Sequence, residues 1–213
     1  MPRQNRVMPT GEIIATSARG LFMGNRGILH NAEQEVVRSY AHKMWIICQL
    51  NFKGRRRKLM QPGRYTELFF LDEATALAAG HRPCFECRRS AAEQFRDAWL
   101  AGNTHLNFGN SVKSAEIDAV LHGERLTGGY YKRDKRKRTC TAVLNTLPNG
   151  TFILWQERPY LVWQDALLPW MPAGYQPAIP RPKADHVAVL TPPSTVAALA
   201  AGYTPRLHDT AQS

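Results

Sequence analysis

One stretch of 25 residues, Tyr65–Arg89, constrains the fold more than any other part of the chain. Its sequence is YTELFFLDEATALAAGHRPCFECRR. The apolar and aromatic run Glu67–Leu71 predicts a buried strand. Asp72 is a typical N-cap residue for the helix that we expect over Ala74–Ala79, and Gly80 is suited to the left-handed stop that ends such a helix. The stretch therefore predicts a strand, a short helix and a sharp corner.

A Cys-x-x-Cys pair, Cys84 and Cys87, follows this corner directly. Two thiolates at this spacing on a tight turn can bind one metal ion, and a structural zinc site needs four ligands. The chain has two other thiols, Cys48 and Cys140, and the histidines that we consider as further candidates are His30, His42 and His81. We expect a structural zinc ion with the candidate ligands Cys84, Cys87, Cys48 and Cys140.

The run from Ala78 to Cys87, AAGHRPCFEC, resembles the zinc-binding N-terminal domain of the Ada family of bacterial alkylation-response proteins. The likeness covers Tyr65–Arg89 and includes Cys48 as the first thiol of the family's upstream pair. The second upstream thiol falls on Phe52, and His81 stands where the family has an aromatic residue. The resemblance implies a zinc site that contains Cys84, Cys87 and Cys48, and a role in the response to DNA damage.

Composition places the chain among globular proteins. It has 213 residues, of which 44% are hydrophobic and 21% charged, values typical of a soluble domain. We find no apolar run of about 18 residues that would span a membrane, and the N-terminus lacks the apolar centre of a secretory signal. Four cysteines in such a chain favour reduced thiols and metal ligation over disulfides. We expect a cytoplasmic protein that does not associate with membranes.

The net charge of +11 is unevenly distributed. From Asp165 to the C-terminus three Lys or Arg residues balance three Asp residues, so the excess lies in residues 1–164. A localised basic body favours a polyanionic partner, and we expect DNA.

Two segments concentrate this charge, KGRRRK at 53–58 and GGYYKRDKRKR at 128–138. Arg binds phosphate through two parallel hydrogen bonds, and aromatic rings beside cations can stack on unpaired bases. The cations next to the cysteine pair are further candidates. The expected nucleic-acid-binding residues are Arg55, Arg56, Arg57, Lys58, Arg82, Arg88, Arg89, Tyr130, Tyr131, Lys132, Arg133, Lys135, Arg136, Lys137 and Arg138.

The element pattern predicts an α+β fold. We expect an N-terminal antiparallel sheet, the cysteine corner, two helices at 88–102 and 114–126, a second small sheet, and a proline-rich strap over 169–183. The second sheet should include a hairpin of 140–144 with 152–155. A division into 1–103 and 104–213 is expected, with one continuous domain as the alternative.

These features lead to two functional hypotheses. The first is a zinc-stabilised DNA-binding protein that serves DNA repair or a transcriptional response. The second is a metal-dependent nuclease acting on DNA, for which His105, Asn107, Asn110, His122 and the pair His30-Asn31 are candidate residues.

Overall fold

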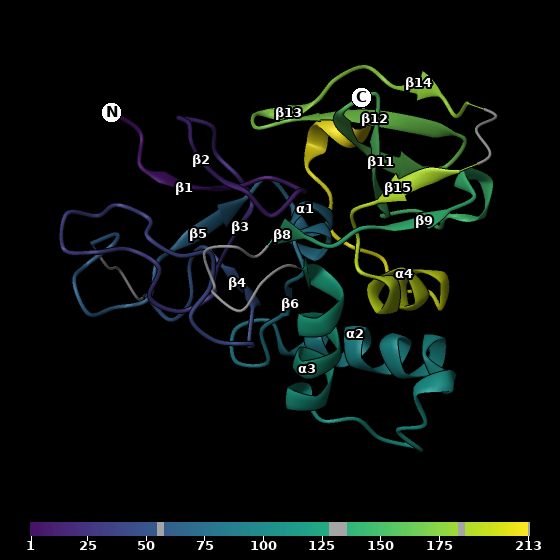
Figure 1. Ribbon diagram of the computed structural model, residues 1–213, viewed down its shortest axis with the longest axis horizontal. Helices are drawn as coiled ribbons and strands as arrows, with labels where there is room; N and C mark the ends of the chain where they lie inside the picture. Colours follow the sequence, from purple (N-terminus) through teal and green to yellow (C-terminus); the bar gives the residue numbers. More distant parts are fainter. Residues whose placement is uncertain (55–57, 128–135, 183–185, 213) are drawn as a thin grey trace.

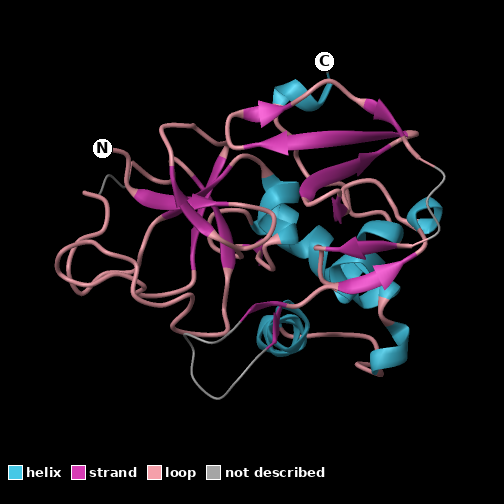
Figure 2. Cartoon of the chain, turned by 45° about the horizontal axis from the view of Figure 1, so that its top comes forward, coloured by secondary structure: helices cyan, strands magenta, loops and turns pink. Residues whose placement is uncertain are grey.

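A computed structural model describes residues 1–54, 58–127, 136–182 and 186–212. It contains several sheets and four α-helices, which confirms the predicted α+β class. Two groups of strands lie on either side of a short central helix, α1 (Figures 1 and 2). The α-helices are α1 (Glu73–Ala78), α2 (Arg89–Gly102), α3 (Ser114–Arg125) and α4 (Pro193–Ala200), and the 3₁₀ turns are η1 (Thr104–Leu106), η3 (Leu144–Thr146) and η4 (Asp209–Gln212).

The first sheet has six strands in the order β2-β1-β5-β3-β4-β6. The pairs β1–β5 and β4–β6 are parallel, and the other three pairs are antiparallel. The expectation of an antiparallel sheet is therefore wrong for two pairs. Helix α1 is the crossover between β5 and β6, and such a crossover gives the two strands it joins the same direction. The strands are β1 (Gln4–Val7), β2 (Ile13–Ala15), β3 (Phe22–Asn25), β4 (Ile46–Gln49), β5 (Leu68–Phe70) and β6 (Arg82–Pro83).

The second sheet is antiparallel, with the order β13-β12-β11-β10-β15-β9 and with β14 paired to β12. The expected hairpin of 140–144 with 152–155 is not formed, because β15 inserts between β9 and β10. The proline-rich segment contributes strands β12, β13 and β14 instead of a strap. The strands are β9 (Cys140–Ala142), β10 (Phe152–Trp155), β11 (Arg158–Trp163), β12 (Ala166–Met171), β13 (Gly174–Tyr175), β14 (Ile179–Pro180) and β15 (Val187–Val189), and a separate pair is formed by β7 (Leu126–Thr127) and β8 (Arg136–Lys137).

The N-terminal end of α1 joins the C-terminal part of the chain to the first sheet. Asp72 caps the helix by accepting a hydrogen bond of 2.9 Å from the Thr75 amide, and it also accepts one of 2.7 Å from the Tyr175 hydroxyl. Glu73 accepts a hydrogen bond of 2.6 Å from the Tyr203 hydroxyl and forms an ion pair of 2.8 Å with Arg88. Both carboxylates are buried, and buried charges need such partners.

The C-terminal end of α1 is bound by cations. The Arg125 guanidinium donates to the Gly80 carbonyl oxygen at 2.8 Å, and the Lys137 ammonium donates to the Ala78 carbonyl oxygen. Cations stabilise the end of a helix where carbonyl groups lack intrahelical partners. Arg125 and the buried Arg26 also lie against the Trp45 ring, with guanidinium carbons 3.8 and 4.2 Å from its centroid. Arg125, Lys137 and Arg26 therefore place positive charge beside the corner that follows α1.

The buried hydrophobic residues of the described chain form three clusters, of which one joins the first sheet to helices α2, α3 and α4. Strand residues such as Phe22 and Phe70 pack with Phe95 and Trp99 of α2 and with Ala198 of α4 and its neighbour Tyr203. Residues on both sides of the expected boundary at 103–104 share this cluster. None of the helices in the described ranges is both long and apolar enough to cross a bilayer.

The Lys137 ammonium generates a prediction about stability and pH. Burial, and then the neighbouring charges of Arg26 and Arg125, lower the pKa of Lys137 to about 7 from a usual 10.5. Between these values the unfolded chain binds more protons than the folded chain, so the free energy of unfolding rises with pH. Between pH 7 and 9.5 it should rise by about 1–3 kcal/mol more in the wild type than in Lys137→Met. Urea unfolding of both proteins at each pH measures the difference, and parallel pH profiles would show that Lys137 titrates normally.

Candidate metal centre and its cavity

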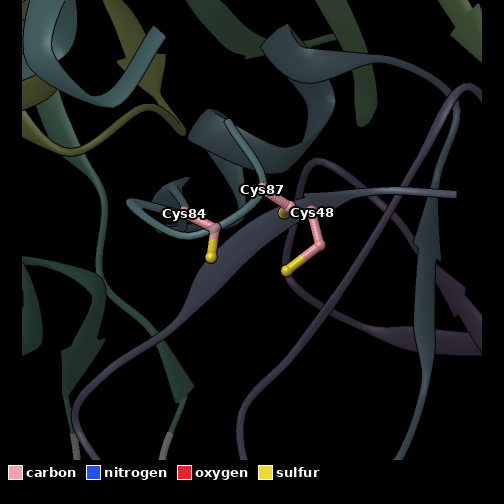
Figure 3. Close-up of side chains that lie close together, drawn as sticks. All are labelled: Cys48, Cys84 and Cys87. Carbon is pink, nitrogen blue, oxygen red and sulfur yellow. The ribbon is translucent and has the colours of Figure 1, made fainter. Parts of the chain in front are cut away.

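Three of the four cysteines lie together on the first sheet. Cys48 is in β4, while Cys84 and Cys87 are in the turn after β6 (Figure 3). The parallel pairing of β4 with β6 places the turn after β6 beside Cys48. The Cys84 amide donates a hydrogen bond of 3.0 Å to the Ile47 carbonyl oxygen. The three Sγ atoms lie within 4.8 Å of one another. This arrangement could hold a metal ion, and it confirms that the Cys-x-x-Cys pair and Cys48 form one cluster.

The donor set fits zinc. Zinc–thiolate bonds of about 2.3 Å in a tetrahedron place two sulfur atoms about 3.8 Å apart, so a small contraction of this cluster suffices. The backbone amide of Glu86 donates to the Cys84 Sγ at 3.4 Å. Amide donors in the turn stabilise negative charge on sulfur, as the hydrogen-bonding partners of metal ligands commonly do. A zinc ion held by Cys48, Cys84 and Cys87 would take its fourth ligand from outside this trio.

The electrostatics of the cluster favour ionisation of one thiol first. Hydrogen bonds from the Cys48 and Cys87 thiols lower the pKa of Cys84. The pKa of Cys48 is raised, first because its proton is shared with Cys84 and Cys87 and then because of burial. A divalent cation can take the place of the protons that these three sulfur atoms share, because metal binding releases thiol protons and stabilises the thiolate form.

The three thiols line a cavity of about 520 Å³ on the same face of the sheet. This volume lies in the range of sites that bind small organic molecules. Its walls are mainly apolar and aromatic, and Asn25 and Glu67 contribute polar groups that are almost fully buried. A metal ion bound by the three thiols would lie next to this cavity, because all three cysteines line it. The lining consists of Met23, Asn25, Ile46, Cys48, Gln49, Leu50, Asn51, Phe52, Leu59, Tyr65, Glu67, Phe69, Cys84, Glu86 and Cys87.

Cys140 is not part of the cluster, which corrects its expected role as a ligand. It lies in β9 of the second sheet, opposite Val189, and the only described group of three or more possible metal ligands is the trio of thiols. The reason is topological, since the chain enters a different sheet before it reaches Cys140.

Two candidate histidines use both ring nitrogens elsewhere. His81 is buried, its Nε2 accepts from the Arg26 guanidinium and its Nδ1 lies 3.2 Å from the Ala76 carbonyl oxygen. Burial, and then the charge of Arg26, hold the pKa of His81 well below its usual value. His30 bonds to the Thr66 hydroxyl and to the Gln61 carbonyl oxygen. Neither ring is therefore placed to complete the metal site.

Two of the expected nucleic-acid-binding arginines are internal. Arg82 forms a buried ion pair with Asp118 at 2.7 Å, and Arg88 pairs with Glu73 while its guanidinium lies 4.3 Å from the Phe22 ring centroid. These two side chains fix the cysteine corner on α3 and α1. The expectation that they contact phosphate is corrected, because their guanidinium groups are buried and paired with carboxylates.

Other expected cations lie on the surface. Lys58, Arg136 and Arg138 are exposed, and Arg89 is exposed with an ion pair of 3.5 Å to Glu93. Lys137 is occupied at the end of α1, as described above. The remaining candidates lie outside the residues that the structure describes, and they are Arg55, Arg56, Arg57, Tyr130, Tyr131, Lys132, Arg133 and Lys135.

The cavity lining was not foreseen from the sequence. Phe69 lies between Leu68 and Phe70, which are fully buried, whereas Phe69 is only partly buried and lines the cavity. The continuous apolar run 68–71 gives no sign of which residue faces outward, and only pairing with β1 and β3 fixes its orientation. The alternation of strand side chains is the signal that could have separated the two faces.

Comparison with protein-family models, with curated proteins and with solved structures finds no match to this chain. The assignment of a function therefore depends on the geometry of the site and on the charge of the chain.

The cluster predicts the metal stoichiometry of the purified protein. We expect one zinc ion per chain in the wild type and in Cys140→Ser. Ser in place of Cys48, Cys84 or Cys87 should weaken zinc binding by more than about 100-fold, since loss of a group that only hydrogen-bonds to a metal ligand already costs about 10–100-fold. Elemental analysis after dialysis against a weak chelator measures this. Equal zinc loss from Cys140→Ser and Cys84→Ser would contradict the three-thiol assignment.

Proposed function

We propose that this protein is a zinc-containing DNA-binding protein that serves DNA repair or a transcriptional response to damage. The observation that carries the proposal is the cluster of Cys48, Cys84 and Cys87 at a cavity on the surface of a strongly basic chain. A thiolate-bound zinc is typical of proteins in which the metal fixes a binding surface. The resemblance of the cysteine corner to the Ada zinc domain supports the same function.

The distribution of charge supports a polyanionic partner. The net charge is +11, and two buried carboxylates, Glu73 and Asp118, are already paired with arginines of the corner. Exposed cations such as Lys58, Arg136 and Arg138 are left to meet an external anion. Neutralising phosphates with such side chains releases counterions from the nucleic acid, which gives a favourable and salt-dependent free energy of binding.

The metal ion would stabilise the fold, and it would also be accessible to a ligand from the cavity. A zinc ion on Cys48, Cys84 and Cys87 would tie β4 to the turn after β6, so its binding energy would contribute to folding. When bound, zinc with three protein ligands also supplies a Lewis-acidic fourth position. The chain itself holds three sulfur atoms in the cavity lining, together with the aromatic side chains described above.

A metal-dependent nuclease is the less supported function. Such an enzyme needs oxygen and nitrogen ligands for a catalytic ion beside the scissile phosphate. In the part of the chain that the structure describes, no second group of His, Asp and Glu residues forms a possible metal site. His105 lies in η1 and His122 in α3, distant in sequence from the hairpin candidate His30.

DNA binding should depend on salt through specific surface cations. The double variant Arg136→Ala/Arg138→Ala should lower the slope of log K against log salt concentration by about 1.4–1.8, because each lost phosphate contact removes about 0.7–0.9. Electrophoretic mobility shifts between 50 and 300 mM salt, with Mg²⁺, Mn²⁺ or Zn²⁺ added, measure binding and cleavage together.

The matched control is Arg158→Ala/Arg206→Ala, which removes two charges from exposed positions, one on β11 and one after α4. It should leave the slope close to that of the wild type. Breakage of the DNA by the wild type would favour the nuclease, and absence of binding at 50 mM salt would overturn the proposed function.

A further inference from the structure

A row of side chains crosses the outer face of the first sheet. Strand pairing places Arg6 opposite Phe69, Phe69 opposite Met23, and Met23 opposite Cys48. Residues that are directly opposite in a sheet project from the same face, and all four side chains are only partly buried. Three inter-strand spacings of about 4.8 Å separate the ends of the row, so Arg6 and Cys48 lie roughly 14 Å apart along the sheet.

The Arg6 end of this row lies in a second cavity, of about 230 Å³, which we call the arginine pocket. It is lined by three arginines and two hydroxyl residues, and the lining contains no carboxylate. No described residue forms an ion pair with any of the three arginines. The arginine pocket consists of Pro2, Arg3, Asn5, Arg6, Thr16, Ser17, Arg19 and Leu59.

Backbone oxygens hold two of these guanidinium groups in place. Arg6 Nε donates to the Ala18 carbonyl oxygen at 2.7 Å, and Arg3 Nη1 donates to the Leu59 carbonyl oxygen at 2.7 Å. The Arg6 guanidinium carbon also lies 4.6 Å from the Phe69 ring centroid. These neutral partners orient the cations without neutralising them. Burial, and then the charge of Arg19, lower the pKa of Arg6, as expected where like charges face one another.

Asn5 gives an independent sign of a missing acceptor. Its side chain is fully buried, its Oδ1 accepts a hydrogen bond from Arg6, and its Nδ2 has no partner. Buried amide nitrogens are almost always hydrogen-bonded. An amide donor beside three guanidinium groups and two hydroxyl groups is a set that suits the oxygens of a phosphate.

The arginine pocket and the thiol cavity are adjacent, because Leu59 lines both. The thiol cavity offers the apolar and aromatic side chains of Met23, Phe52, Tyr65 and Phe69, on which a flat ring can stack. A base can enter such a cavity only when it is unpaired, and stacking on aromatic side chains is how single strands are commonly bound.

We propose that the outer face of the first sheet binds single-stranded DNA, with a backbone phosphate in the arginine pocket and an unpaired base in the thiol cavity beside Cys48. This inference rests on the proposed function and names the strand form and the two subsites. The row Arg6–Phe69–Met23–Cys48 is the track between them, so a strand bound there passes within reach of the metal centre.

The experiment measures binding of a short fluorescent single-stranded DNA by anisotropy at several salt concentrations. Arg3→Ala/Arg19→Ala should weaken binding roughly tenfold at low salt and lower the salt slope by about 0.7–1.4, the loss of one or two phosphate contacts on a single strand. Arg158→Ala, an exposed arginine on β11, is the control and should bind as the wild type does. Melting curves establish that each variant is folded, and Arg19→Ala alone, at an exposed position, provides a second variant.

A strand of the same length with abasic sites tests the base subsite without changing the protein. Its binding to the wild type should be weaker by about 10-fold, because stacking of a base is lost, and Arg3→Ala/Arg19→Ala should weaken it further. A duplex of the same sequence should also bind more weakly than the single strand.

The outcomes separate the two proposals. If the wild type binds no DNA of any form, the proposed function fails. If the wild type binds but Arg3→Ala/Arg19→Ala keeps both its affinity and its salt slope, the arginine pocket is not the phosphate site. If abasic and normal strands bind the wild type equally, the thiol cavity does not receive a base.

Discussion

The fold depends on the burial of both ends of helix α1. A helix of six residues has few internal hydrogen bonds, and its unpaired terminal groups must be satisfied by other parts of the chain. Asp72 and Glu73 accept hydrogen bonds at the N-terminal end from residues as distant as Tyr175 and Tyr203. Arg125 donates to the carbonyl group of Gly80, just beyond the C-terminal end. These contacts fix the short helix between the two sheets. They also fix the direction in which the chain continues from Gly80 into β6.

The clustering of Cys48, Cys84 and Cys87 is a consequence of that direction. Gly80 adopts a positive φ of 89°, and a Cβ there would lie 2.7 Å from Arg125, so the turn requires glycine. The chain then pairs with β4, and the buried Arg82–Asp118 ion pair holds this segment against α3. Cys84 and Cys87 reach Cys48 because β6 lies beside β4. The cluster thus depends on the packing of the helix more than on the local cysteine spacing.

Local signals in the sequence predict helices α1, α2 and α3 and the Cys-x-x-Cys pair of the candidate site. Asp72 was expected as a cap and Gly80 as a stop, and the Cys-x-x-Cys pair marks its own turn. The predictions that are wrong concern contacts between residues that are distant in the sequence. The sequence shows that Arg82 and Arg88 are cations, but it does not show that they form ion pairs with Asp118 and Glu73. Only the fold brings these partners together. Cys140 and the row that contains Arg6 depend in the same way on which strands pair, and no local pattern encodes that pairing.

We propose that Cys48, Cys84 and Cys87 hold a zinc ion as thiolates, with one further ligand from outside the three. Zinc X-ray absorption fine structure of the zinc-loaded protein tests it most directly, because zinc–sulfur and zinc–oxygen or –nitrogen distances differ. We expect three sulfur atoms at about 2.3 Å and one lighter atom at about 2.0–2.1 Å, unchanged in Cys140→Ser. Four sulfur ligands, or two, would contradict it.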